Sequence, residues 1–218
     1  MDKVELGCFS LMVLTDGGIA QDEVYFVTTD KMLAELFSKL SKILWKKTPI
    51  RIRYRRGKHS WMKLKIKSSK IADTLAKLTK NKSSIPEFVM EEKDPKILTE
   101  YLRVIVSTDG GVVFYQNKRS DGYIRTERHI IIGSKNEPIK NQLRELFSRL
   151  GINTRTVKEG LRISGRDNLQ KFRDKVRFIS GCRVTRKSHK WRGYTKNHVL
   201  NLMLASYSGS TAPRNSVP

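Results

Sequence analysis

Residues 11–18 (LMVLTDGG) return in a loosely copied form as residues 104–111 (VIVSTDGG). In both copies an apolar segment ends in an acid and two glycines, and the residues that follow have the composition of a β-hairpin. A second landmark repeats in the same order, because ELFSKL at residues 35–40 reappears as ELFSRL at residues 145–150. This duplication predicts two related units, since a solenoid would need at least three short repeats.

The two copies differ in the length of chain between their landmarks. The segment from the acid to the ELFS sequence is 17 residues longer in the second copy. Insertions of this size are tolerated best in surface loops and hairpins. We therefore expect the second unit to contain a longer hairpin, with strands over residues 112–116 and 123–133.

Hydrophobic periodicity and turn residues predict the same order of elements in each unit. Each apolar motif segment has helical length, and the glycines after it are expected to end the helix, which places each acid at a helix C-terminus. Thr29 or Asp30, Asp94 and Asp167 are candidate N-caps of later helices. In the first unit we expect helices over residues 4–15, 30–45 and 69–79, a hairpin over 19–29, and strands over 50–55 and 62–67. In the second unit we expect helices over residues 97–108, 137–150, 167–178 and 196–205, and strands over 112–116, 123–133, 154–157 and 160–163.

The fold class that follows is α+β, with two pseudo-symmetric αββαββα units that each contain a four-stranded antiparallel sheet. The first unit spans residues 1–84 and the second spans residues 94–205. Residues 85–93 lack periodicity, so we interpret them as a linker with Pro86 as its break. Residues 206–218 are rich in Ser, Gly and Pro and are expected to form a disordered tail.

The charge of the chain restricts its partners. The 218 residues include 44 Lys and Arg against 21 Asp and Glu, a formal net charge of +23. Such a chain repels itself unless a polyanion is its usual partner, and nucleic acid is the first candidate. A membrane is disfavoured, because no apolar segment approaches the roughly 20 residues that span a bilayer. The N-terminus lacks the features of a signal peptide, so an intracellular location is expected, in the cytoplasm, the nucleoid or an organelle.

The cysteines, histidines and tryptophans offer no second kind of site. Cys8 and Cys182 lack the paired spacing of a zinc site and are expected to be buried small side chains. The four histidines are scattered and form no metal-nuclease motif. Trp61 and Trp191 lie among basic residues and could stack on bases, but packing against a sheet is favoured.

Residues 50–55 and 62–67 alternate apolar and basic side chains with a period of two. This is the period of a β-strand, so we expect one buried and one cationic face on two adjacent strands. A β-ribbon fits the DNA major groove, where arginine donates two hydrogen bonds to guanine and lysine more often meets phosphate. An edge defended by charge would explain a few lysines but not six basic residues. The candidate DNA-binding residues are Arg51, Arg53, Arg55, Lys63, Lys65, Lys67, Lys118, Arg119, Arg125, Arg128, Arg155, Lys158 and Arg162.

The duplicated acids suggest a metal site. If the two apolar helices pack side by side, their ends coincide and Asp16 and Asp109 meet where the units join. Two carboxylates at close range repel each other unless cations lie between them. Such ligands suit Mg²⁺, which keeps waters, binds phosphate oxygens and supports phosphodiester hydrolysis. A simple turn would explain one Asp-Gly-Gly sequence, but its duplication in a polycation favours the metal site.

The two segments ending in Thr-Asp-Gly-Gly, each opening a unit of helix, hairpin, helix, hairpin and helix, resemble the LAGLIDADG homing endonucleases in their single-chain, two-motif form. The resemblance extends to about Leu204. It implies a saddle of two four-stranded sheets in the DNA major groove, with the motif helices packed at its centre. It also implies that the last acid of each motif, Asp16 or Asp109, binds divalent metal, and that both strands are cut to leave short 3′ overhangs.

Two motif positions depart from the family pattern. The small residue that lets the motif helices approach corresponds to Leu11 and Val104, and an earlier acid corresponds to Leu14 and Ser107. We therefore expect the helices to pack differently, whereas the acid before glycine is intact in both copies.

The resemblance also implies a metal-binding set and a pair of lysines. The cofactor would be Mg²⁺, which Mn²⁺ can replace. Family members usually place a lysine from each unit near the scissile phosphates, in the segment after the last helix of that unit. Lys82 and Lys187 are the candidates here, with Lys80 and Arg186 as competitors, and their charge would stabilise the reacting phosphate. In so basic a chain a solvated or phosphate-positioning lysine is an equally good interpretation. The implied metal-binding residues are Asp16, Asp109, Gly17 and Gly110.

Together these features predict a site-specific, metal-dependent endonuclease that cuts a long double-stranded DNA site and is encoded by a mobile intron. An RNA-binding intron maturase and a catalytically inactive DNA-binding protein on the same scaffold are the alternatives. The positive charge does not separate DNA from intron RNA, whereas retention of both acids argues against an inactive protein. A monomer is expected, because the duplication already supplies the twofold symmetry.

Overall fold

The computed structural model describes residues 2–56, 59–118, 120–184, 188 and 190–208 of the chain. Its first unit has the expected order of helix, hairpin, helix, hairpin and helix. The elements are α1 (Lys3–Leu14), β1 (Gly17–Ile19), β2 (Glu23–Thr28), α2 (Lys31–Trp45), β3 (Ile50–Arg56), β4 (His59–Lys67) and α3 (Ser69–Leu78).

The same order returns in the second unit after a short helix, α4 (Glu87–Met90). The elements of this unit are α5 (Pro95–Thr108), β5 (Gly110–Lys118), β6 (Ile124–Gly133), α6 (Glu137–Arg149), β7 (Arg155–Val157), β8 (Gly160–Ser164) and α7 (Arg166–Lys171). A π-helical turn, η1 (Phe172–Val176), follows α7 directly. The last described elements are α8 (Lys196–Ala205) and a 3₁₀ turn, η2 (Ser206–Ser208).

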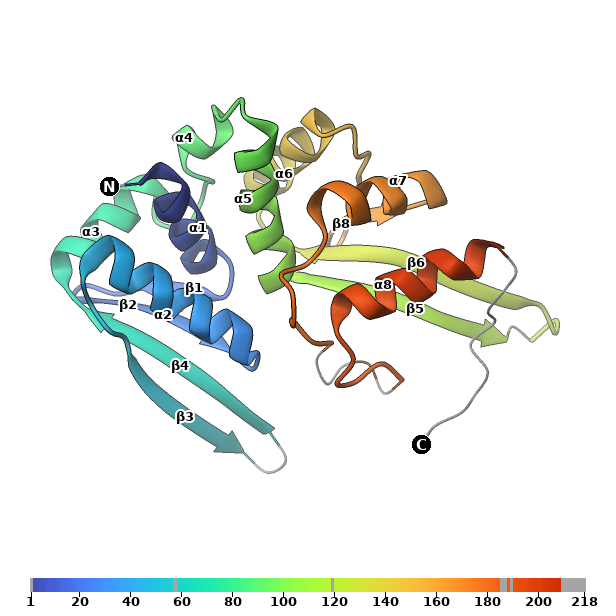
Figure 1. The fold of residues 1–218 in the computed structure, drawn as a ribbon, viewed down its shortest axis with the longest axis horizontal. Coiled ribbons are helices and arrows are strands. Elements are labelled where there is room, and N and C mark those ends of the chain that lie inside the picture. Colours follow the sequence, from blue (N-terminus) through green and yellow to red (C-terminus); the bar gives the residue numbers. More distant parts are fainter. Residues whose placement is uncertain (1, 57–58, 119, 185–187, 189, 209–218) are drawn as a thin grey trace.

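Two four-stranded antiparallel sheets define the architecture, with strand orders β1-β2-β4-β3 and β5-β6-β8-β7. The two units lie side by side, and α1 and α5 are adjacent between them (Figure 1). The expected α+β class with two four-stranded sheets is confirmed. The extra residues of the second copy lie in the β5–β6 hairpin, whose strands are longer than β1 and β2.

Several local expectations need correction. Asp30 and Asp94 cap α2 and α5 as expected, each accepting a hydrogen bond from the backbone N–H two residues on. Asp167 does not cap a helix, because Gly165 is the N-cap of α7 and Asp167 lies in its first turn. The motif glycines do not end α1, since Thr15 is its C-cap and the glycines begin β1.

The segment between the units has more structure than a linker requires. Residues 85–93 contain α4, and Ile85 and Val89 are buried in the core. The backbone N–H of Ile85 donates to Gln142 Oε1 at 2.9 Å, and Gln142 Nε2 donates to Ser84 Oγ at 3.0 Å. These contacts attach the connection to α6, so they fix the position of the chain between the units.

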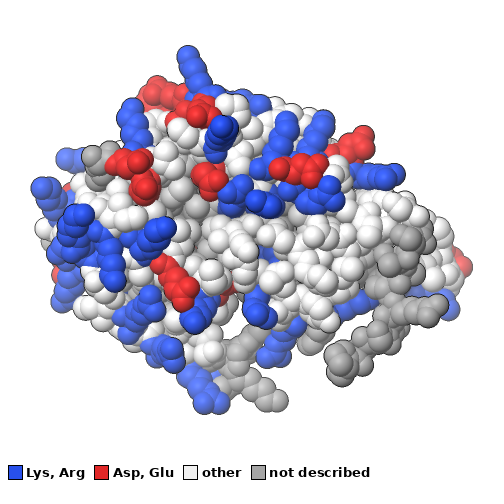
Figure 2. Space-filling view, viewed as in Figure 1, with Lys and Arg blue, Asp and Glu red and all other residues white. Residues whose placement is uncertain are grey.

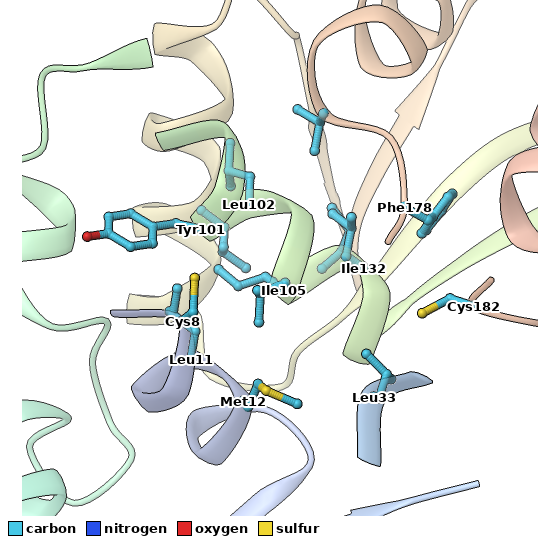
Figure 3. Close-up of a cluster of buried hydrophobic side chains, with 14 of the residues drawn as sticks. Cys8, Leu11, Met12, Leu33, Tyr101, Leu102, Ile105, Ile132, Phe178 and Cys182 are labelled. Atoms are coloured by element: carbon cyan, nitrogen blue, oxygen red, sulfur yellow. The ribbon is translucent and has the colours of Figure 1, made fainter. Parts of the chain in front are cut away.

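α1 and α5 pack against each other at the centre of a continuous apolar core. Figure 3 shows Cys8 and Leu11 of α1 beside Tyr101 and Ile105 of α5. A Cβ added to Gly7 would overlap the ring of Tyr101. Gly7, one turn before the motif, is therefore a small residue at which the two helices approach closely.

Helices α2 and α3 cover one face of the first sheet, and among the described residues no helix covers the other face. Residues opposite each other in neighbouring strands point to the same face. Phe26 of β2, Leu64 of β4 and Arg51 of β3 are opposite one another. Phe26 and Leu64 are buried, and Arg51 Nη2 donates to Ser38 Oγ of α2 at 3.0 Å. Arg51 therefore lies on the helix-covered face.

The expectation of one shared cationic face on β3 and β4 is wrong. Lys63 of β4 is opposite Ile52 of β3 and Val27 of β2, so these residues lie on the helix-free face. The alternation of apolar and basic residues is out of phase between the paired strands. As a result Arg51, Arg53 and Arg55 point to the face opposite to that of Lys63, Lys65 and Lys67.

The cysteines are free and buried, as expected. Burial raises the pKa of both thiols to about 12. Trp191 is also buried and stacks on Phe114 of β5, with ring centroids 5.5 Å apart. Across the part of the chain that is described, no helix is both long and apolar enough to cross a membrane.

Candidate active site

The two motif acids are held in the same way by their units. Asp109 caps α5, and Asp16 follows Thr15, the C-cap of α1. The carbonyl oxygen of Asp16 accepts a hydrogen bond from Val27 N–H at the end of β2, and that of Asp109 accepts one from Gly133 N–H at the end of β6, both at 3.0 Å. Each acid is therefore fixed between a helix end and the second strand of a hairpin.

The glycine after each acid is sterically required. A Cβ added to Gly17 would lie 2.6 Å from the Cα of Val13, and one added to Gly110 would collide with the carbonyl oxygen of Val106. In both units the first strand therefore starts against the last turn of the motif helix. The close approach explains why the acid and its glycine recur together.

The side chains of Asp16 and Asp109 line the same cleft and lie close enough for each to affect the pKa of the other. Burial, and then the neighbouring Asp16, raises the pKa of Asp109 to about 7. Burial also raises the pKa of Asp16, although the side-chain interaction with Asp109 opposes that shift. The expected meeting of the two acids is thus observed, and one proton shared between them relieves their repulsion.

A lysine from each unit lies beside this pair. Lys82 Nζ donates to the carbonyl oxygen of Gly17. Lys196 Nζ donates to the carbonyl oxygen of Gly110 at 2.7 Å and to that of Ser107 at 2.8 Å. Burial lowers the pKa of both ammonium groups, and the two acids oppose the shift. The acids, glycines and lysines thus form a pseudo-twofold arrangement.

Lys196 was not among the residues predicted from the sequence. Lys187, the lysine predicted for the second unit, lies outside the described residues, as does its competitor Arg186. Lys80, the competitor of Lys82, is exposed. A sequence signal for Lys196 does exist, because it shares the buried face of α8 with Val199 and Leu200, three and four residues on. A charged residue at an apolar helical position indicates a specific partner.

Among the clefts beside the acids, two lead toward the sheets. One, of about 790 Å³, is lined by both acids, Lys196, Tyr115 and Ile131 and extends over the helix-free face of the second sheet. The other, of about 220 Å³, is lined by residues that include Asp16, Lys196, Val27 and Trp61 and reaches the first sheet. The carboxyl pair is therefore accessible from the helix-free face of the second sheet, and Asp16 also from the cleft that reaches the first sheet.

The donor set fits a divalent cation. It offers two carboxylates and the carbonyl oxygens of Gly17 and Gly110, which are the hard oxygen ligands that Mg²⁺ and Mn²⁺ accept. No group of three or more His, Cys, Asp and Glu side chains suited to a metal occurs among the residues that the structure describes. Water and phosphate oxygens would therefore complete the coordination, as is usual for Mg²⁺ in phosphoryl-transfer sites.

The candidate DNA-binding residues divide between the two faces. Lys63, Lys65, Arg125, Arg155 and Arg162 lie on the helix-free faces. The helix-covered faces carry Arg51, Arg53, Arg55 and Arg128.

Arg128 is occupied within the fold, because its guanidinium donates to Ser206 and lies 4.7 Å from the ring of Tyr207. Lys67 and Lys118 lie at strand ends and Lys158 in the β7–β8 turn, whereas Arg119 is outside the described residues. Figure 2 shows Lys and Arg over both units, with most acidic side chains toward the upper edge of this view.

Comparison with known proteins agrees with this description. Residues 96–177 match the family model of the LAGLIDADG-like domain. No curated protein sequence matches the chain. The family match covers the second unit from α5 to η1.

Solved structures show the same fold. The full-length DUF199/WhiA protein from Thermatoga maritima aligns with a TM-score of 0.59 and 13% identity over 95% of this chain, which spans 62% of that protein's length. The homing endonuclease I-WcaI, solved bound to its DNA recognition sequence, aligns with a TM-score of 0.57 and 11% identity over 83% of this chain and 84% of its own. I-DmoI, solved with DNA and Mn, aligns with a TM-score of 0.55 and 14% identity over 80% of this chain and 97% of its own.

Proposed function

We propose that the chain is a site-specific, divalent-metal-dependent endonuclease of double-stranded DNA, of the kind encoded by mobile introns. The observation that carries this proposal is the contact between Asp16 and Asp109 at the junction of the units, with Lys82 and Lys196 placed symmetrically beside them. The fold alone does not decide the activity, because it is shared by a DUF199/WhiA protein as well as by homing endonucleases.

Asp16 and Asp109 would hold divalent metal ions, together with the carbonyl oxygens of Gly17 and Gly110. Bound there, Mg²⁺ or Mn²⁺ supplies an activated water and neutralises the leaving oxygen. The carboxylates would hold the metal ions at the helix ends, and the ions would attract the attacked phosphate to that position. I-DmoI structures contain Mn, Mg or Ca, which supports the choice of a divalent ion.

The lysines supply positive charge at the reacting phosphates. Lys82 and Lys196 lie on the two sides of the acid pair, one from each unit. Their lowered pKa values show that they are already partly removed from water, and charge placed in such a site stabilises a developing oxyanion more than solvated charge does. Lys196 takes the role that the sequence suggested for Lys187.

The DNA duplex would lie across both helix-free faces. The two clefts lead from these faces to the acids. Two-stranded β-ribbons fit the major groove, and the net charge of +23 attracts the phosphate backbone. One monomer would bind both half-sites, since the two units are already joined by α1 and α5.

The test is incubation of the protein with a randomised duplex library in Mg²⁺, and in parallel in Ca²⁺, followed by sequencing of cut ends and retained DNA. We expect sequence-specific double-strand cuts in Mg²⁺ and retention without cutting in Ca²⁺. Asp16→Asn and Asp109→Asn should abolish cutting and keep binding. Their melting temperatures in metal-free buffer at pH 8.5, above the Asp109 pKa of about 7, should not fall below that of the native chain, because each removes one of two repelling carboxylates.

Other outcomes would assign the chain differently. Selective retention without cutting in any divalent metal would contradict the endonuclease and indicate a DNA-binding protein. Retention of intron RNA in preference to duplex DNA would indicate a maturase. Cutting that survives both Asn substitutions would show that the activity does not belong to this site.

A further inference from the structure

We propose that the two units recognise bases by different chemistry, the first through apolar contact with thymine methyl groups and the second through arginine hydrogen bonds to guanine. The inference rests on the proposed function, because it takes the helix-free faces to lie in DNA major grooves. It concerns the base composition of each half-site and the residues that select it.

In the middle of the helix-free face of the first sheet the cations are occupied, whereas Lys67 and Arg56 lie at strand ends on this face. Lys63 and Lys65 both pair with Glu23, with Nζ to carboxylate oxygen distances of 3.1 and 3.5 Å. Lys63 also lies 4.1 Å from the centroid of the Tyr25 ring. Arg51, Arg53 and Arg55 of β3 point to the other face, and Arg56, which lies on this face, is the last residue of the strand. The middle of this face therefore has little free hydrogen-bond donor capacity among its described cations.

The same face exposes apolar and aromatic side chains instead. Ile50 and Tyr54 of β3 are 52% and 39% exposed. Tyr54 stacks on Trp61 of β4 with centroids 5.6 Å apart, and Ile52 and Val27 flank Lys63 in the neighbouring row. Contiguous exposed apolar groups on a functional face indicate an apolar ligand surface. In a major groove, the apolar feature of base edges is the thymine methyl group.

The helix-free face of the second sheet also exposes Tyr115, but it differs in carrying a pair of arginines. Arg155 of β7 and Arg162 of β8 are directly opposite each other. Like charges in that position destabilise a sheet, and neither guanidinium makes a hydrogen bond or ion pair with a residue that the structure describes. The Nε of Arg162 is buried without a partner. Arg162 therefore has a buried donor that no described residue satisfies, and Arg155 lies exposed beside it.

The position of Arg162 favours a base over a phosphate. Arg162 is half-buried and lies opposite Ile131 of β6, which in turn lies opposite Gly111 of β5. Gly111 is two residues after Asp109, so these three residues form the row of the sheet beside the acid. Arg162 therefore projects from the floor of the sheet and not from its rim, where phosphates would lie. Guanine presents two acceptors, O6 and N7, that match the guanidinium geometry.

The experiment is selection from a randomised duplex library in Ca²⁺ with the full chain, which reads binding without cutting. The native protein should select a site with guanine enriched in one half and thymine enriched in the other. In the guanine-enriched half only, Arg162→Gln should change a preference for guanine into one for adenine. The discrimination in favour of guanine at that position should fall by at least about tenfold. Ile52→Gln should weaken a thymine preference in the other half only.

Arg53→Gln is the matched control, because Arg53 is exposed on β3 but points to the helix-covered face. It should change the base preference of neither half-site. The inference is overturned if Arg162→Gln weakens binding equally for all sequences, which would mean a phosphate contact, or if Ile52→Gln leaves the preference unchanged. Native protein that selects a site without this asymmetry would also overturn it while leaving the endonuclease intact. A protein that selects no duplex at all would instead contradict the proposed function.

Discussion

Lys196 is a buried cation at the start of α8, and two of its three donors bind carbonyl oxygens at the site. Its ammonium donates to the carbonyl oxygens of Ser107 and Gly110. Lys196→Met fills the space but leaves both carbonyls without their donor, at a cost of roughly 1–3 kcal/mol. We expect the melting temperature to fall by about 3–10 °C, measured by calorimetry in metal-free buffer.

Lys82→Met is the comparison, because Lys82 donates to one carbonyl, that of Gly17, and is only partly buried. Its melting temperature should fall less than that of Lys196→Met. Equal effects would show that the second acceptor of Lys196 contributes nothing to stability.

The two cysteines allow a prediction about pH. Burial raises the pKa of Cys8 and Cys182 to about 12 from the ordinary value of 9.0, so the fold favours the neutral thiol. The stability that this protonated form contributes is present below pH 9 and is lost as the pH rises toward 12. Native protein at pH 8.5 should therefore react with iodoacetamide far more slowly than the unfolded chain, as mass spectrometry can follow. Rapid labelling of folded protein would contradict the assigned burial.

At the residue scale, the sequence predicted the two acids better than the lysines that lie beside them. Asp16 and Asp109 could be found because the duplication marks both positions and the helix ends bring them together. Lys82 follows α3 directly and was also found. Lys196 was missed because 19 residues separate η1 from α8, and the distance of a residue from the site in space cannot be deduced from its distance along the chain.

At the scale of elements, the start of β5 against α5 is a tight contact that can be tested. Gly110→Ala places a Cβ against the carbonyl oxygen of Val106, and overpacking of this kind costs roughly 1–3 kcal/mol. Gly111→Ala is the control, because its Cβ would meet only Ile131 Cγ2, at 3.7 Å. We expect chemical denaturation to show a lower free energy of unfolding for Gly110→Ala and a nearly unchanged value for Gly111→Ala. Equal losses would mean that strand propensity, not the clash, governs this position.

The elements themselves were largely predictable, but the pairing of strands was not. The helices and strands follow periodicities that lie within each segment, and these gave boundaries close to the observed ones. Which side of β3 faces the helices depends on its register with β4, and Ile50 pairs with Lys65 instead of an apolar residue. Such a phase difference is a property of two segments, so Arg51 and Arg53 could not be assigned to a face from their own strand.

At the scale of the whole molecule, the net charge of +23 predicts strongly salt-dependent binding. Each phosphate that Lys or Arg neutralises releases counterions, so the logarithm of the binding constant falls linearly with the logarithm of the salt concentration. For a site spanning both sheets we expect roughly 6–10 phosphate contacts, and a loss of about 10³–10⁵ in affinity between 50 and 200 mM salt. Fluorescence anisotropy with the selected duplex in Ca²⁺ measures this slope. A shallow slope would indicate that only one unit engages the DNA.

The pseudo-twofold arrangement of the site also predicts how the two strands are cut. Lys82 contacts the carbonyl after Asp16, and Lys196 contacts the carbonyl after Asp109, so each lysine belongs to one half of the site. If each half serves one scissile phosphate, Lys82→Met should slow the cutting of one strand by roughly 10²–10³-fold and Lys196→Met that of the complementary strand. Both variants should therefore accumulate nicked duplex in Mg²⁺, with the nick on opposite strands in strand-labelled gels. The matched control Lys80→Met changes an exposed lysine two residues from Lys82 and should cut both strands at the native rate. Equal slowing of both strands by either variant would instead show a single centre that the two lysines share.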